Sequence, residues 1–162
     1  FGTGRPLVGV SALEALACAA APSLGNGTHA LAVWMDAQRD EVFAAAYTVV
    51  VEAGRAVPPA TLDGPVAAPP EDVLTRWRSQ GRLPRLVAVG DGAIRYAPLI
   101  RAQGVGLIIE VIEQPMAIAA AVAHLGRMVH AAGGAHPPHG IRPVYVRRPD
   151  AELARERRRS QV

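Results

Sequence analysis

The strongest constraint on the fold is a pair of apolar runs separated by a short polar turn. Ala30–Met35 and Glu41–Val51 are rich in residues that favour β-strands, and the polar run Asp36–Asp40 lies between them. Together these segments predict an antiparallel hairpin. A further turn at Ala53–Arg55 predicts a third strand near Ala56–Val57.

The segment before the hairpin carries a helix signal. Pro6–Val10 predicts a short buried strand. Ser11 is a suitable N-cap, and Glu14 three residues later completes a capping box, so a helix is predicted over Ala12–Ala21. We expect this helix to end before Pro22, because a proline disfavours helical geometry in the residue that precedes it.

After the hairpin, the chain alternates between strands and helices. Pro58–Pro70 is rich in proline and predicts a linker on the surface. Apolar spacing then predicts a strand over Leu86–Val89, a buried strand over Leu107–Ile112, helices over Glu71–Gln80, Ala93–Gln103 and Met116–Ala132, and an extended segment over Ile141–Val146. The alternation predicts an α/β fold with a mixed sheet flanked by helices. We expect a single lobe over 1–147 and a basic tail over 148–162.

The composition narrows the class of protein. Half of the residues are hydrophobic, which is typical of a globular protein and not of a disordered one. No apolar run reaches the ~18 residues of a transmembrane helix, so we expect no membrane association. Cys18 is the single cysteine and lies in an apolar run, which predicts a small buried side chain and fits a reducing cytoplasm.

The net charge is +3, and arginines are concentrated at the C-terminal end. A basic tail of this kind can contact the phosphate backbone of RNA, and a solvated chain end is the alternative interpretation. The candidate contact residues are Arg147, Arg148, Arg155 and Arg157.

A glycine-rich turn is the best candidate for a ligand site. Gly90, Asp91 and Gly92 follow a predicted strand and precede a predicted helix, where backbone amides can approach a phosphate. The turn therefore is a weak candidate for nucleotide binding, although it matches neither GxGxxG nor a Walker loop. A tight turn with Asp91 as a helix cap is the alternative.

Other reactive side chains do not form a recognisable catalytic or metal-binding set. Asp36, Asp40 and Glu41 are residue types that do acid–base chemistry or hold a hard metal ion, but their place on a hairpin turn beside Arg39 favours surface ion pairing. The pair His136 and His139 is separated by two prolines that splay the rings, so a loop is predicted there and not a metal site. We therefore expect no catalytic residue and no metal.

Three segments, in order, resemble one bacterial family. Leu7–Ala17 (LVGVSALEALA) is similar to its strand-to-helix segment, and Asp36–Phe43 (DAQRDEVF) resembles its Asp-Ala-Arg-x-x-Glu-Val-Tyr hairpin, with Gln38 and Phe43 as conservative departures. Pro143–Arg147 (PVYVR) resembles its C-terminal Pro-x-Tyr-Leu-Arg. The family is TsaB, also called YeaZ, and the resemblance covers the second half of such a protein.

The resemblance implies an actin-like, RNase-H-like lobe of the kind shared by sugar kinases and Hsp70. It also implies a non-catalytic scaffold and dimerisation subunit that supports TsaD in threonylcarbamoylation of the tRNA adenosine beside the anticodon. The implied partners are TsaD and the ATPase TsaE, in a homo- or heterodimer, with tRNA contacted indirectly and ATP bound only at the level of the complex. The alternative is a nucleotide-binding enzyme of the actin-like ATPase superfamily that uses Gly90–Gly92.

Overall fold

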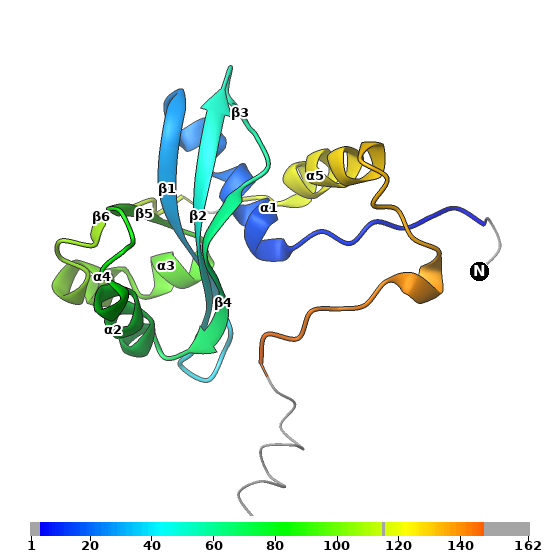
Figure 1. The fold of residues 1–162 in the computed structure, drawn as a ribbon. Coiled ribbons are helices and arrows are strands. Elements are labelled where there is room, and N and C mark those ends of the chain that lie inside the picture. Colours follow the sequence, from blue (N-terminus) through cyan, green and yellow to red (C-terminus); the bar gives the residue numbers. More distant parts are fainter. Residues whose placement is uncertain (1–3, 115, 148–162) are drawn as a thin grey trace, which may run out of the picture.

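The computed structural model describes residues 4–114 and 116–147, in which a mixed β-sheet carries helices on both faces (Figure 1). The strand order is β3-β2-β1-β5-β6, with β4 also paired to β2. The strands are β1 (Gly27–Asp36), β2 (Val42–Glu52), β3 (Arg55–Ala56), β4 (Ala60–Ala68), β5 (Leu86–Val89) and β6 (Ile108–Val111).

The predicted hairpin is confirmed and forms the centre of the sheet. β1 and β2 pair antiparallel without interruption, from Gly27 opposite Val51 to Asp36 opposite Val42. Successive side chains of a strand point to opposite faces, and here both faces are apolar: Leu31 and Val33 point one way and Ala32 and Trp34 the other. The strand is therefore buried on both sides.

Helices α1 (Ala12–Ala19) and α5 (Ala119–Ala131) lie on one face of the sheet (Figure 1). The predicted cap of α1 is confirmed, because the Ser11 hydroxyl accepts a hydrogen bond from the Glu14 amide at 3.4 Å. Most of α1 is buried, whereas α5 buries chiefly Leu125 and leaves Met128 partly open.

The other face is covered by α2 (Pro70–Gln80), α3 (Asp91–Arg95) and α4 (Ala97–Gln103) (Figure 1). The predicted apolar face of α2 is confirmed, since Val73, Leu74 and Trp77 are buried. The rings of Trp77 and Trp34 lie 6.1 Å apart at 53°, a tilted aromatic contact that joins α2 to β1.

The predicted surface linker Pro58–Pro70 is wrong, because most of this segment is strand β4, paired antiparallel to β2. The register shifts between Ala44 and Ala46, opposite the part of β4 that contains Gly64 and Pro65. Proline lacks an N–H for the ladder and is tolerated in a strand at an edge or a bulge. In the described part of the chain β4 pairs with β2 alone, so the proline does not interrupt the sheet.

The predicted strand Pro6–Val10 is also wrong. Only Leu7 makes a bridge, and its partner is His136 near the C-terminal end of the described residues, through backbone hydrogen bonds of 2.8 and 2.9 Å. The segment is thus outside the sheet, and Leu7 is 47% exposed. Its apolar residues resemble a strand locally, but the sheet has no position for it.

Three further predictions differ in detail from the structure of the C-terminal half. The strand at Leu107–Ile112 is present as β6, but it is an edge strand, and Ile109 is 50% exposed. The helix predicted over Ala93–Gln103 is two helices, because the chain leaves helical geometry at Tyr96 and Pro98 lies in the first turn of α4. The extended segment predicted over Ile141–Val146 forms no strand.

Candidate functional site

A polar cluster lies where β1 ends beside the start of α3. The Asp91 carboxylate accepts hydrogen bonds from the Asp36 amide at 3.2 Å and from the Gly92 amide at 2.9 Å. Arg95, on the same short helix, donates to the Asp36 carboxylate at 2.7 Å. These contacts join the end of the hairpin to α3.

The hairpin turn itself has an unusual backbone. Gln38, Arg39 and Asp40 all have left-handed φ angles, of 61°, 56° and 58°. Each costs roughly 1–2 kcal/mol for a residue with a side chain, so the turn needs support. Asp36 supplies it by accepting the Gln38 amide at 3.0 Å and the Gln38 side-chain amide at 3.2 Å.

The electrostatics of the turn favour ionised, paired side chains. The hydrogen bond from Arg95 lowers the pKa of Asp36, burial opposes this in part, and the Gln38 amide lowers it further. Arg95 also approaches Asp40 at 3.4 Å. The sequence predicted surface ion pairing for Asp36, Asp40 and Glu41, and it is confirmed for all three. Arg95 is the partner of the first two, and Arg147 is the partner of Glu41. A carboxylate held ionised in this way is a poor general acid at neutral pH.

The glycines of the Gly90–Gly92 turn have a packing role that the sequence did not reveal. A Cβ on Gly90 would lie 2.2 Å from the carbonyl oxygen of Trp34, and one on Gly92 would lie 2.9 Å from the carbonyl carbon of Met35. Gly90 also has φ 108°. Glycine therefore allows α3 to lie directly against the backbone of β1. Nucleotide binding at this turn stays a prediction.

Arg147 is the one member of the predicted RNA-contact set within the described residues. It forms an ion pair with the carboxylate of Glu41, and its guanidinium lies 5.5 Å from the ring centroid of Phe43. Both partners are at the start of β2. Arg148, Arg155 and Arg157 lie outside the described residues, and RNA contact by the set stays a prediction.

A buried charged site, which the sequence did not reveal, lies where β4 meets α2. Asp63, on β4, is 4% exposed and accepts hydrogen bonds from Trp77 Nε1 at 3.0 Å and from Arg76 at 3.1 and 3.2 Å. Gln80 and Arg82 donate to it at 3.2 and 3.4 Å. The apolar residues around Asp63 favour a strand, but the prolines nearby favour a linker, so the sequence did not predict β4.

This site is a structural tie between β4 and α2. Burial raises the pKa of Asp63, but the hydrogen bonds from Arg76, Trp77 and Gln80 outweigh it and bring the pKa below the usual 3.8. A buried carboxylate is stable only when it is paired in this way. Both carboxylate oxygens of Asp63 already accept hydrogen bonds, which fits a structural role.

The remaining candidate side chains are one cysteine and two histidines, and each lies in a structural contact or element. Burial, together with the charge of Glu14, raises the pKa of Cys18 to about 11, so its thiol is protonated at neutral pH. His136 lies at the bridge to Leu7, and His139 is in a short 3-10 helix (Pro138–Gly140).

Within 4–114 and 116–147, histidine, cysteine and acidic residues form no group of three suited to a metal ion. In the same ranges every helix is too short or too polar to span a bilayer.

Comparison with known proteins gives a likeness of fold. No family model matches the sequence, and no curated protein matches it. A Pseudomonas aeruginosa protein described as uncharacterized with similarity to peptidase YeaZ matches 88% of this chain, with 24% identity and a TM-score of 0.65. YeaZ from Pseudomonas aeruginosa matches 87% of this chain, with 21% identity and a TM-score of 0.61.

This chain covers 60% of the length of each of those two structures. At such identities the likeness establishes architecture. The predicted fold class, a mixed sheet flanked by helices in an actin-like, RNase-H-like lobe, is confirmed, and the resemblance to YeaZ holds at the level of the fold.

Proposed function

We propose that this chain is part of a TsaB-type subunit that acts by protein–protein contact and not by catalysis of its own. In this proposal the subunit supports a TsaD-like partner during threonylcarbamoylation of tRNA, with a TsaE-like ATPase as a third component. ATP is bound at the level of the complex, tRNA is contacted indirectly, and the protein works in the cytoplasm.

The observation that carries the proposal is the meeting of two segments on which the resemblance rests. Asp36–Phe43 and Pro143–Arg147 are distant in sequence, yet Arg147 pairs with Glu41 and packs on Phe43. Asp36, the first residue of the hairpin segment, supports its turn and joins it to α3 through Arg95. A family motif made of structural contacts of this kind suits a scaffold.

Three carboxylates described above, including Asp63 outside these segments, support the same interpretation. Asp36, Asp63 and Glu41 each have an arginine partner. A catalytic carboxylate usually has a pKa shifted towards the operating pH, whereas the pKa values of Asp36 and Asp63 are lowered.

The test is size-exclusion chromatography with light scattering on the complete reading frame, alone and mixed with the TsaD homologue of the same genome. We expect a stoichiometric heterocomplex. Complementation of a strain that lacks TsaB, with tRNA threonylcarbamoyladenosine measured by mass spectrometry, gives an independent readout. The proposal fails if the folded protein neither binds the homologue nor restores the modification.

The alternative, nucleotide binding at Gly90–Gly92, needs a different test. A bulky substitution such as Gly92→Val is unsuitable, because the added side chain would meet the backbone of β1 and destabilise the fold. Titration of the unmodified protein with ATP and Mg²⁺ by calorimetry avoids this problem. A saturable heat would support the alternative, and its absence at millimolar ATP would remove it.

A further inference from the structure

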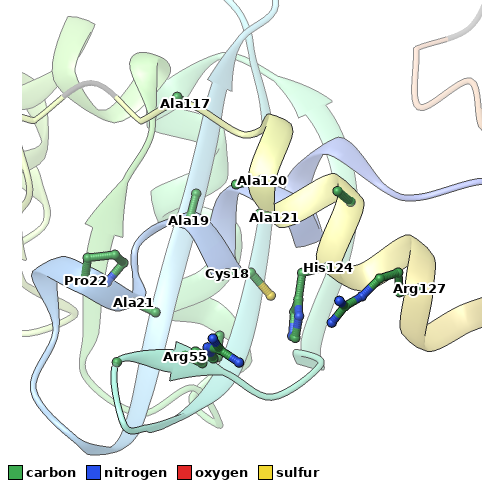
Figure 2. A pocket seen from close by; sticks show the side chains of 13 residues that line it. Cys18, Ala19, Ala21, Pro22, Arg55, Ala117, Ala120, Ala121, His124 and Arg127 are labelled. Atoms are coloured by element: carbon green, nitrogen blue, oxygen red, sulfur yellow. The ribbon is translucent and has the colours of Figure 1, made fainter.

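A groove is lined by residues of α1, β3 and α5, on the face of the sheet that carries the two helices (Figure 2). β3 lies at the opposite end of the hairpin from the polar cluster. The volume of the groove is about 580 Å³, within the roughly 300–1,000 Å³ typical of small-molecule sites. The floor consists mostly of small apolar side chains from α1, from the short 3-10 helix Ala21–Ser23 and from α5: Cys18, Ala19, Ala21, Pro22, Ala120 and Ala121.

Three basic side chains surround this floor. His124 and Arg127 extend from α5 towards Arg55 on β3, and the Cys18 sulfur points into the same space (Figure 2). They come from elements far apart in the sequence, so the fold and not a local charge run brings them together. No acidic residue is among the described residues that line the groove.

Within the described part of the chain, the two arginines of the groove have no carboxylate partner. Arg76, Arg95 and Arg147 elsewhere in the protein each form an ion pair, whereas among the described residues neither Arg55 nor Arg127 does. Glu52 lies opposite Arg55 in the β2–β3 register, yet the two form no ion pair. The groove thus places two guanidinium groups, neither in an ion pair within the described residues, beside an apolar floor.

We infer that this groove binds a small amphiphilic anion, a molecule with a carboxylate or phosphate group on an apolar body. Guanidinium groups offer paired N–H donors that match the oxygens of both anions. The apolar body would lie on the alanine floor and lose its exposure to water, which adds roughly 25 cal/mol per Å² of apolar area. Neither the resemblance nor the proposed scaffold role includes such a site.

The first experiment measures binding of two probes, octanoate and octyl phosphate, to the complete chain by NMR titration below their micelle concentrations. Inorganic phosphate tests the charged head alone, and octylammonium tests the apolar body with the opposite charge. We expect the anionic amphiphiles to bind at least tenfold more tightly than either control. Preference for one of the two anions supports the site and identifies its head group.

The second experiment assigns binding to the groove. Arg55→Gln and Arg127→Gln remove charge from its rim, and each should weaken binding about tenfold, which corresponds to about 1.4 kcal/mol. Ala120→Phe adds volume over the floor and should weaken binding without a change in charge. Arg78→Gln, on α2 at the other face of the sheet, is the matched control and should bind like the unmodified protein.

Three results would overturn the inference. The first is no saturable binding of either anionic probe at millimolar concentration, and the second is equal binding of octylammonium. The third is unchanged affinity in both rim variants, with unfolding midpoints that match the unmodified protein. Arg55 is exposed and Arg127 lies on the open side of α5, so loss of folding is not the expected effect of these substitutions.

Discussion

The guanidinium of Arg147 is paired with the carboxylate of Glu41, which lies 106 positions earlier in the chain. The same guanidinium lies over the ring of Phe43 at 5.5 Å. This contact seats the last described residues on the start of β2, beside the turn that Asp36 supports. The contact therefore gives Glu41 and Phe43 of the hairpin segment a structural role together with Arg147 of the C-terminal segment.

The Arg147 contact should hold the C-terminal segment in place. Arg147→Ala should lower the free energy of unfolding by about 1 kcal/mol, the sum of a partly exposed ion pair and a cation–π contact. It should also speed proteolysis after Val144. A double-mutant cycle with Glu41→Gln should give a coupling energy of about 0.5 kcal/mol. Arg142→Ala, in the same segment, is the control, and equal effects of the two arginine variants would contradict the prediction.

Asp63 should contribute stability that depends on pH. Its folded pKa lies below the unfolded value of 3.8, so its contribution is present above that pH and is lost as the pH falls through the lower folded pKa. Urea unfolding between pH 2 and 7 should show this loss in the unmodified protein, and Asp63→Asn should flatten the profile. Glu52→Gln, at an exposed acidic residue, should leave the profile unchanged.

Removal of the Asp63 side chain should be more damaging than loss of its charge. Asp63→Ala leaves the indole N–H of Trp77 buried without its partner, and Arg76 loses its ion pair. We expect a loss of about 3 kcal/mol, against about 1–2 kcal/mol for Asp63→Asn, which keeps one acceptor oxygen. Thermal and urea unfolding measure both, and an Asp63→Ala variant as stable as the unmodified protein would show that the tie is not structural.

Gly90 should not tolerate a side chain. Gly90→Ala places a Cβ within 2.2 Å of the Trp34 carbonyl at φ 108°, so we expect a loss of at least 3 kcal/mol or failure to fold. Gly25→Ala is the matched control, because nothing lies within 4 Å of its Cβ and its φ is not positive. It should change the free energy of unfolding by less than about 1 kcal/mol.

Cys18 should react slowly with alkylating reagents. A pKa of about 11 leaves only about one thiol in a thousand ionised at pH 8, and burial restricts access further. Mass spectrometry of iodoacetamide-treated protein should show far slower modification of the native protein than of the urea-unfolded protein. Similar rates in the two states would mean that the α1 region opens readily.

Elements whose signals lie in one contiguous stretch of chain are predictable from the sequence. The hairpin Ala30–Val51 was recognised from two β-rich runs and a polar turn, and α2 from the spacing of Val73, Leu74 and Trp77. The Ser11 cap was found for the same reason, since a capping contact joins residues three positions apart. Local periodicity and local hydrogen bonds depend on neighbouring residues, so they can be read without knowledge of the fold.

Contacts between segments that are distant in the chain depend on the three-dimensional packing. The prolines of Pro58–Pro70 favour a linker over a strand, and the segment forms β4 because the edge of β2 is available to pair with it. The sequence likewise could not say that Gly90 faces the backbone of Trp34 or that Arg147 reaches Glu41. Such pairings depend on how the sheet and its helices pack in space, and residues distant in the chain carry no local pattern that reports their contact.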